Sequence, residues 1–419
     1  MGTLWNRTQP VRLVAGLAGL VALLGGCWVA PGGGPNRNGH NGVETLVGID
    51  SAADMTEAWQ APVGWPPPSP VVFGRYVYST MAGEVIAREV ATGTTGWTHP
   101  LYEMQAIDMF VDDGTLLVVE GGSAMNGPIG VRHDLTTGEF IGSYSPPVQA
   151  IRGSLGAHVA RPWRYAPEFT LVVTDLAGST AWSTPILVDA QSWAPKPTMT
   201  AERVVISGKG LVSTDPGSTS TALGLRAYAI EGPPASCATD SSGEYPVTYG
   251  CPAWAVAVDG TSMTAPVVSD DLGTVVVGTD AGLVYAISEA TGSVLWTANV
   301  GSAVTADPGI AGETVLVPTA ADGLVALPLG GCGASSCAPI WTSASPAGVA
   351  QQPVAAGGAV FVGHDDGVVA AYPVSGCGGA TCDAVWSTPL DGDFDAPLAL
   401  GSGHLLVTVD SVMHAFTPQ

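Results

Sequence analysis

The segment TAPVVSDDLGTVVVGTDAGLVYAISEATGSVLW, from Thr264 to Trp296, gives the clearest indication of the fold. It holds short apolar runs that are separated by turn residues, and its last run ends in Trp296. Between the second and third runs stands Asp280-Ala281-Gly282, where the glycine can adopt the positive φ that a tight hairpin needs. The segment therefore predicts four short antiparallel strands joined by tight turns.

The same unit recurs along the C-terminal half of the chain. Two clear copies follow, from Ala306 to Trp341 and from Gln351 to Trp386. Prolines at 266, 308, 353 and 397 stand 42, 45 and 44 residues apart, and tryptophans at 254, 296, 341 and 386 stand 42, 45 and 45 apart. Because two independent markers keep one period, the sequence predicts a repeat architecture.

Looser copies extend the series toward the N-terminus and beyond the third clear unit. They span 70–97, 104–144, 148–182, 189–254 and 395–416. The last copy lacks a fourth strand, which Glu57-Ala58-Trp59 can supply from the start of the chain. We therefore predict an all-β fold, a β-propeller of four-stranded antiparallel blades whose ring is closed by an N-terminal strand. Eight blades are expected, with seven as the alternative if 148–182 is misread.

Composition agrees with many short strands and limits the partners. Only 12% of the 419 residues are charged, while Gly reaches 56 and Pro 33. The 13 basic residues face 36 acidic ones, and removal of a segment with Arg7 and Arg12 would leave a net charge of −25. Such a surface repels phosphate backbones, so nucleic acid is excluded as a partner.

The N-terminus has the features of an export signal. Residues 1–12 carry Arg7 and Arg12 and no acid, and an apolar run too short to span a bilayer follows up to Gly25. The run ends in Leu24-Gly25-Gly26-Cys27, which resembles the bacterial lipobox and implies lipidation of Cys27. We predict a signal peptide at 1–26, a flexible Gly/Pro/Asn-rich tether at 27–55 and a propeller at 56–419. The protein is then a membrane-anchored lipoprotein on the extracytoplasmic side, in the periplasm or at the cell surface.

Cysteine spacing supports export. Once Cys27 is assigned to lipid, six of the seven cysteines remain. The loops GCGASSC and GCGGATC occupy matching places in two units, so local pairing is favoured among the fifteen connectivities. The predicted disulfides are Cys237–Cys251, Cys332–Cys337 and Cys377–Cys382, which imply an oxidising compartment. Thiolate metal binding is the disfavoured alternative, because no CxxC spacing occurs.

The recurrent tryptophans are interpreted as structural. A buried indole removes a large apolar area from water, and one per blade would join each sheet to its neighbour. The alternative, sugar-stacking aromatics, would need them exposed. The residues predicted to dock neighbouring blades are Trp59, Trp97, Trp182, Trp254, Trp296, Trp341 and Trp386.

The blade motif AISEATGSVLW, preceded by VGTDAGLVY, resembles the pyrroloquinoline-quinone (PQQ)-like propeller repeat. That quinoprotein-like superfamily is WD40-like in architecture and includes both quinoprotein alcohol dehydrogenases and the BamB-like lipoprotein of the outer-membrane barrel-assembly machinery. The resemblance implies either a quinone enzyme or a protein-binding scaffold.

The enzyme hypothesis fits the residues poorly. The dehydrogenases resembled here place a disulfide between adjacent cysteines over the cofactor and use Ca²⁺ with an Asp base, but this chain has no adjacent cysteine pair. Asp391-Gly392-Asp393-Phe394-Asp395 lacks the later ligands of a calcium loop, and His364 precedes an ordinary Asp-Asp-Gly turn. We therefore expect no catalytic residues, no metal, and neither PQQ nor Ca as a cofactor.

Two long links between second and third strands mark a candidate binding surface, because equivalent loops emerge on one face of a propeller. These links are 121–130 and 208–224, represented by Gly121, Asn126, Lys209 and Asp215. The cysteine loops belong to the opposite face. The favoured function is a monomeric, non-catalytic scaffold that binds a cell-envelope protein, and the alternative is a ligand-binding or PQQ/Ca-dependent quinoprotein-type enzyme.

Overall fold

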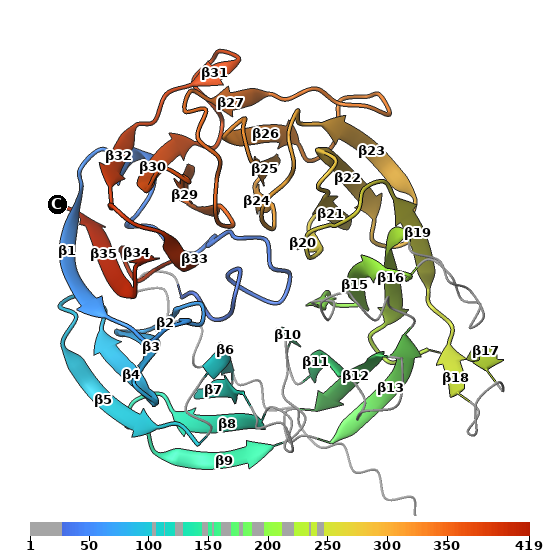
Figure 1. The fold of residues 1–419 in the computed structure, drawn as a ribbon, viewed down its shortest axis with the longest axis horizontal. Coiled ribbons are helices and arrows are strands. Elements are labelled where there is room, and N and C mark those ends of the chain that lie inside the picture. Colours follow the sequence, from blue (N-terminus) through green and yellow to red (C-terminus); the bar gives the residue numbers. More distant parts are fainter. Residues whose placement is uncertain are drawn as a thin grey trace, which may run out of the picture.

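The computed structural model describes residues 27–419, apart from short stretches within them. The stretches left out are 103–105, 113, 122–128, 145–149, 153–154, 161–168, 176–178, 187–196, 212–221, 234–235 and 241–246. Eight sheets, each built on four antiparallel strands, are arranged as a ring around one axis (Figure 1). The prediction of an eight-bladed all-β propeller is confirmed, and the unit at 148–182 is one of the blades.

Each blade runs from an inner strand at the axis to an outer strand at the rim. Blade 1 consists of β2 (Val71–Phe73), β3 (Tyr76–Met81), β4 (Glu84–Glu89) and β5 (Thr95–Pro100), and blade 2 consists of β6 (Ala106–Asp112), β7 (Thr115–Glu120), β8 (Ile129–Asp134) and β9 (Phe140–Tyr144). Blade 3 consists of β10 (Ala150–Arg152), β11 (Leu155–Ala160), β12 (Phe169–Asp175) and β13 (Thr180–Ile186), and blade 4 consists of β14 (Thr198–Met199), β15 (Arg203–Lys209), β16 (Leu223–Ala229) and β19 (Trp254–Val258). The link before β19 forms a separate hairpin of β17 (Ser236–Asp240) and β18 (Val247–Gly250).

Blades 5 to 8 correspond to the clearest repeats in the sequence. Blade 5 consists of β20 (Val267–Ser269), β21 (Thr274–Gly278), β22 (Leu283–Ser288) and β23 (Val294–Asn299), and blade 6 consists of β24 (Gly309–Ala311), β25 (Thr314–Pro318), β26 (Leu324–Pro328) and β27 (Trp341–Ser343). Blade 7 consists of β28 (Val354–Ala356), β29 (Ala359–Gly363), β30 (Val368–Pro373) and β32 (Trp386–Pro389), and blade 8 consists of β33 (Phe394–Gly401), β34 (His404–Val409), β35 (Val412–Pro418) and β1 (Met55–Pro62).

Strand β1 closes the ring as the sequence predicts. It pairs antiparallel with the C-terminal strand β35, with Glu57 opposite Phe416 and Trp59 opposite Ala415. The ring of His414 also lies 2.9 Å from the Glu57 carboxylate, measured from Nδ1 to Oε1. The last blade is therefore assembled from an N-terminal strand and three C-terminal strands, and β35 is paired on both of its sides.

Burial explains the apolar runs of the repeat. All five residues of β21, β25 and β29 are buried, because each second strand is covered by neighbouring blades on both faces. The outer strand β23 alternates instead, with Trp296 and Ala298 buried and exposed side chains between or beside them. The core is thus divided into layers between adjacent blades rather than gathered in one centre.

The recurrent tryptophans lie at these layers. Each indole Nε1 donates a hydrogen bond to a backbone carbonyl of the next blade around the ring, at 2.7–3.1 Å; the pairs are Trp59–Val90, Trp97–Leu135, Trp182–Ile230, Trp254–Glu289, Trp296–Leu329, Trp341–Val374 and Trp386–Met55. Trp386 reaches Met55 because β1 belongs to the eighth blade. These seven indoles pack between neighbouring blades and do not form an exposed surface for stacking against sugars.

The Thr-Gly turn between third and fourth strands is explained by the same contact. Gly292 has a φ of +73°, and a Cβ there would lie 2.8 Å from the Trp254 ring. Gly93 and Gly138 stand in the same relation to Trp59 and Trp97. The glycine is required both for the turn conformation and for the approach of the neighbouring indole.

Two predicted disulfides, Cys332–Cys337 and Cys377–Cys382, are present. Cys251 is also disulfide-bonded, while the side chain of its predicted partner Cys237 lies outside the described residues. Each of the two described loops pairs with the outer strand of the preceding blade. Short strand β31 (Thr381–Cys382) runs parallel to β27 as a fifth strand, and Ser336 forms a parallel bridge with Thr297 of β23.

Replacing Cys377 and Cys382 together with serine is expected to lower the free energy of unfolding by about 2–3 kcal/mol, because the short closed loop is released. The backbone bonds from Thr342 to Ala380 and from Ala344 to Cys382 should weaken with it. Urea unfolding without reductant and amide exchange at Thr342 and Ala344 measure both effects. An unchanged midpoint together with full protection of these amides would contradict the role assigned to the loop.

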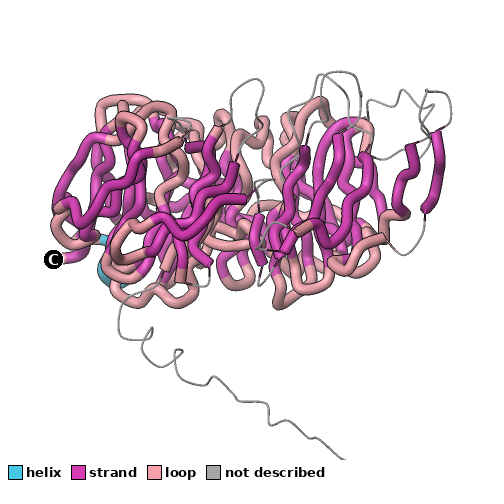
Figure 2. Tube along the Cα trace, turned by 90° about the horizontal axis from the view of Figure 1, so that it is seen from below, coloured by secondary structure: helices cyan, strands magenta, loops and turns pink. Residues whose placement is uncertain are grey.

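The prediction of a flexible tether at 27–55 is wrong. Trp28, Val47 and Ala52 are buried at 1%, 0% and 0% exposure, and residues Ile49–Ala52 form the short helix α2. Helix α2 lies at the lower edge of the ring in Figure 2. Glycine and proline do not mark a free linker here, because they allow the chain to bend along the inside of the propeller. No helix among the residues that the structure describes is long and apolar enough to cross a membrane.

Candidate functional site

The central channel of the propeller is occupied by the protein's own N-terminal segment. Residues 28–41, which we call the strap, run beside the inner strands of the ring (Figure 1). They make backbone hydrogen bonds in the order of the blades; the pairs are Trp28–Val72, Val29–Val111, Pro35–Met199, Asn36–Val268, Asn38–Ile310 and Gly39–Ala355. The Asn41 side chain then donates to Leu400 of the eighth blade at 2.7 Å. The strap thus joins inner strands of seven blades.

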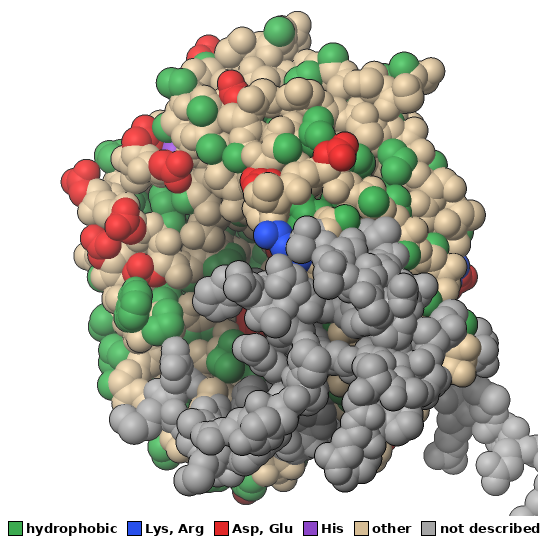
Figure 3. All heavy atoms as spheres, turned by 45° about the vertical axis from the view of Figure 1, so that its right-hand side comes forward, with side chains coloured by type: hydrophobic (Ala, Val, Ile, Leu, Met, Phe, Trp, Pro, Cys, Tyr) green, Lys and Arg blue, Asp and Glu red, His purple; other side chains and the backbone are tan. Residues whose placement is uncertain are grey.

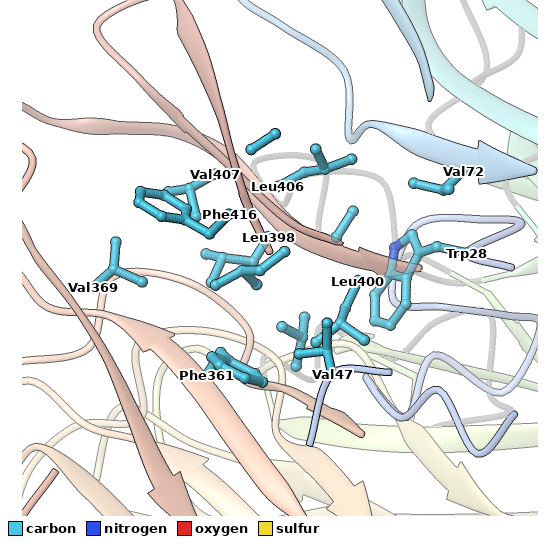
Figure 4. Packing of buried hydrophobic residues seen from close by; sticks show 14 of the residues in the cluster. Trp28, Val47, Val72, Phe361, Val369, Leu398, Leu400, Leu406, Val407 and Phe416 are labelled. Atoms are coloured by element: carbon cyan, nitrogen blue, oxygen red, sulfur yellow. The ribbon is translucent and has the colours of Figure 1, made fainter. Parts of the chain in front are cut away.

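Trp28 fixes the beginning of the strap. It exchanges two backbone hydrogen bonds of 2.8 Å with Val72 of β2. Its ring packs within a buried cluster that includes Val72, Leu400 and Val47 (Figure 4). At 1% exposure this indole is one of the largest fully buried side chains among the described residues.

Turns with positive φ let the strap follow the curved channel wall. Gly32, Gly33 and Gly39 have φ values of +72°, +88° and +67°, and Arg37 has 53°. A Cβ on Gly39 would lie 2.4 Å from the carbonyl oxygen of Pro353. The strap therefore needs a Gly/Asn-rich composition, because its turns have positive φ and its backbone lies in close contact with the backbone of the ring.

Polar groups in the middle of the strap are paired with the ring. The Arg37 guanidinium lies 3.2 Å from the Asp307 carboxylate, with the two side chains only 9% and 18% exposed. Asp307 also accepts a hydrogen bond from the Ala265 amide at 2.9 Å, and Gln352 Nε2 donates to the Arg37 carbonyl at 2.6 Å. A buried ion pair with these extra bonds specifies position and register more than it adds stability.

The two faces of the ring differ in which turns they carry. The hairpin face holds the turns between second and third strands, such as Asp280–Gly282 and Asp365–Gly367. The opposite face, here the Cys27 face, holds the turns between first and second strands and those between third and fourth strands. Cys27 lies there because the strap enters antiparallel to β2, which ends at the Gly74-Arg75 turn.

Carboxylates are frequent on the hairpin face. Asp280 accepts hydrogen bonds from the amides of Thr261 and Ser262 at 2.8 and 3.0 Å. Partial burial raises the pKa of Asp280, but these bonds and those from the two hydroxyl groups outweigh it and lower the pKa to about 2. Acidic side chains are also spread over the surface seen in Figure 3.

The predicted partner-binding loops leave the ring on the hairpin face. Gly121 follows β7, and Lys209 ends β15. Asn126 and Asp215 lie outside the described residues. The structure therefore places the described ends of both loops on one face.

The described residues do not match the quinone and calcium site of the dehydrogenases that the repeat resembles. No group of three His, Cys, Asp or Glu side chains in the described part of the chain could hold a metal ion. His364 is 1% exposed and lies within hydrogen-bonding distance of the Ala347 carbonyl and the Tyr372 hydroxyl, so it is a paired interior residue. Asp393 and Asp395 are tied to the Asp410-Ser411 turn of their own blade.

The fold is an eight-bladed β-propeller, and its repeat is similar to the PQQ-like propeller repeat. A family model described as outer membrane protein assembly factor BamB matches residues 44–140 and 247–329. BamB from Moraxella catarrhalis superposes with a TM-score of 0.59 at 15% identity, covering 87% of this chain and 99% of that one. No curated protein matches the sequence.

Dehydrogenases share the same architecture. The quinohemoprotein alcohol dehydrogenase of Pseudomonas putida HK5 gives a TM-score of 0.64 at 12% identity over 94% of this chain and 80% of that one. The enzyme from Comamonas testosteroni gives 0.58 at 12% identity over 94% and 82%. At such identities these similarities show the fold and leave the activity to be argued from the residues.

Proposed function

We propose that this protein is a non-catalytic, lipid-anchored propeller that holds a partner protein in the bacterial cell envelope. The observation that carries the proposal is the strap, which occupies the channel with backbone hydrogen bonds and the buried Arg37–Asp307 pair. Because the interior of the ring is committed to the protein's own chain, the surfaces left for recognition are its two faces. The similarity to BamB supports a binding role in the envelope.

The hairpin face is the partner surface in this proposal. Both long links between second and third strands begin there, and equivalent loops of repeat proteins form binding surfaces. Residues 227–419 contain no Lys or Arg, so the turns of blades 5 to 8 are acidic. A partner with a basic surface would associate faster with such a face, and its capture would weaken as salt is raised.

Crosslinking in intact cells tests the proposal. One variant replaces 122–128 and 212–221 with short Gly/Ser links, and the matched control carries Asp271→Ser and Leu272→Ser in a turn of the opposite face. We expect the loop variant to lose the captured partner while the control retains it. Equal capture by both variants, with both folded, would refute the assignment of the hairpin face.

An absorption spectrum tests the enzymatic alternative. The purified protein is mixed with pyrroloquinoline quinone and Ca²⁺ and then freed of unbound quinone. The proposal predicts no retained chromophore. A stoichiometric bound chromophore would favour a quinoprotein-type enzyme over the scaffold.

A further inference from the structure

We propose that the Cys27 face lies directly against a membrane of zwitterionic lipid, with Val43 and Leu46 in contact with the lipid surface. The inference rests on the lipid anchor included in the proposed function, and it adds an orientation. A propeller on a flexible tether would sample all orientations, whereas this chain leaves no room for such motion.

The first argument is that no flexible segment separates the anchor residue Cys27 from the ring. Trp28 directly follows Cys27 and is held by two hydrogen bonds to Val72 and by burial. One residue spans at most about 3.6 Å. Acyl chains on Cys27 that enter a bilayer would therefore bring the rim of the channel to the lipid surface.

The second argument is the loop that follows the strap. It returns to the Cys27 face, where the Asn41 side chain donates to both the Cys27 and Leu400 carbonyl groups at 3.2 and 2.7 Å. The Glu44 carboxylate is turned inward at 3% residue exposure and accepts bonds from the amides of Leu46 and Gly403 at 2.7 and 2.9 Å. The loop therefore buries its charge.

The same loop exposes its apolar side chains. Val43 and Leu46 are 67% and 59% exposed, although Leu46 touches the Gly403 turn of the last blade. A loop that faces water usually has the opposite arrangement, with apolar groups inside and charge outside. Fixed apolar side chains beside the attachment point of a lipid are what a membrane-contacting rim requires.

The third argument is the distribution of other exposed apolar residues. Twelve large hydrophobic residues are exposed in the described part of the chain, and nine of them lie on the side of the Cys27 face. These nine stand in the loop that follows the strap, in a turn on this face, or at the start of a strand that follows such a turn. They are Val43, Leu46, Phe140, Ile141, Leu272, Val294, Leu295, Ile340 and Val385. The hairpin face side has only Trp65, Tyr102 and Ile107.

Charge decides the kind of lipid. Asp270 and Asp271 directly precede Leu272, and blades 5 to 8 supply no basic residue to offset them. Anionic headgroups would be repelled, whereas zwitterionic headgroups carry no net charge. Contact is therefore expected to weaken as anionic lipid is added to the bilayer.

The test uses the lipidated full-length protein in phosphatidylcholine vesicles that contain a doxyl-labelled phosphatidylcholine as quencher. A fluorophore is attached through Val43→Cys or, as the matched control on the hairpin face, through Ala321→Cys. We expect several-fold stronger quenching at position 43 than at 321. A variant with about ten Gly/Ser residues inserted between Cys27 and Trp28 should still float with vesicles but lose much of the difference.

The outcomes separate the two proposals. Protein that floats with vesicles but is quenched equally at both positions overturns the orientation and leaves the anchor intact. Failure to float refutes the anchor and the orientation with it. Shielding of position 43 in a vesicle-free dimer of a Cys27→Ser form would assign the face to a second copy of the chain instead.

Discussion

Replacing Trp28 with alanine is expected to lower the free energy of unfolding by about 3–5 kcal/mol, the cost usual for a fully buried tryptophan. The indole is 1% exposed and packs with Val72, Val47 and Leu400, so its removal leaves a cavity where the strap meets the first and last blades. Urea unfolding followed by far-ultraviolet circular dichroism measures the change.

Trp65 provides the matched control, because its side chain is 76% exposed. Trp65→Ala should change the free energy of unfolding by less than about 0.5 kcal/mol. A similar small effect of Trp28→Ala would mean that the strap does not contribute to the stability of the ring in solution.

Replacing Trp341 with alanine is expected to cost about 3–5 kcal/mol as well. This indole is 1% exposed, donates to the Val374 carbonyl at 3.1 Å and lies beside Tyr372, with ring centroids 6.2 Å apart. Its loss would remove the largest side chain of the buried cluster between blades 6 and 7. The measurement is the same unfolding experiment.

A double-mutant cycle with Gly376 tests the contact itself. A Cβ on Gly376 would lie 2.4 Å from the Trp341 ring, and the backbone there has a φ of +75°. Gly376→Ala is therefore destabilising alone, but part of its cost should vanish when Trp341 is alanine. Strictly additive effects would contradict direct packing of the indole on this glycine.

The blades were predictable because each repeat carries its own markers. The period of the tryptophans, the Asp-Gly hairpins and the missing fourth strand of the last unit are local signals, and Glu57-Ala58-Trp59 fills the gap that they leave. The two short cysteine loops were predictable for the same reason, since local pairing needs no knowledge of the ring.

The strap was missed because its contacts are non-local. Gly32, Gly33 and Gly39 have the composition of a free linker, and only the closed ring provides the wall against which their turns pack. The signals that could have found it were Trp28, an indole with no function in a solvated tether, and the polar side chains of Arg37 and Asn41. The parallel pairing of the cysteine loops with preceding blades is likewise a property of the assembled ring.

The central claim is that N-terminal residues are built into the propeller: the strap bonds along the inner strands and β1 closes the ring. Hydrogen–deuterium exchange of the protein beginning at Cys27 tests it most directly. The amides of Trp28 and Asn41, which donate to the Val72 and Ala355 carbonyl groups, should exchange as slowly as the amides of Val72 and Ala355 in the inner strands. Exchange of the whole stretch 27–48 within seconds, beside protected blades, would contradict the account.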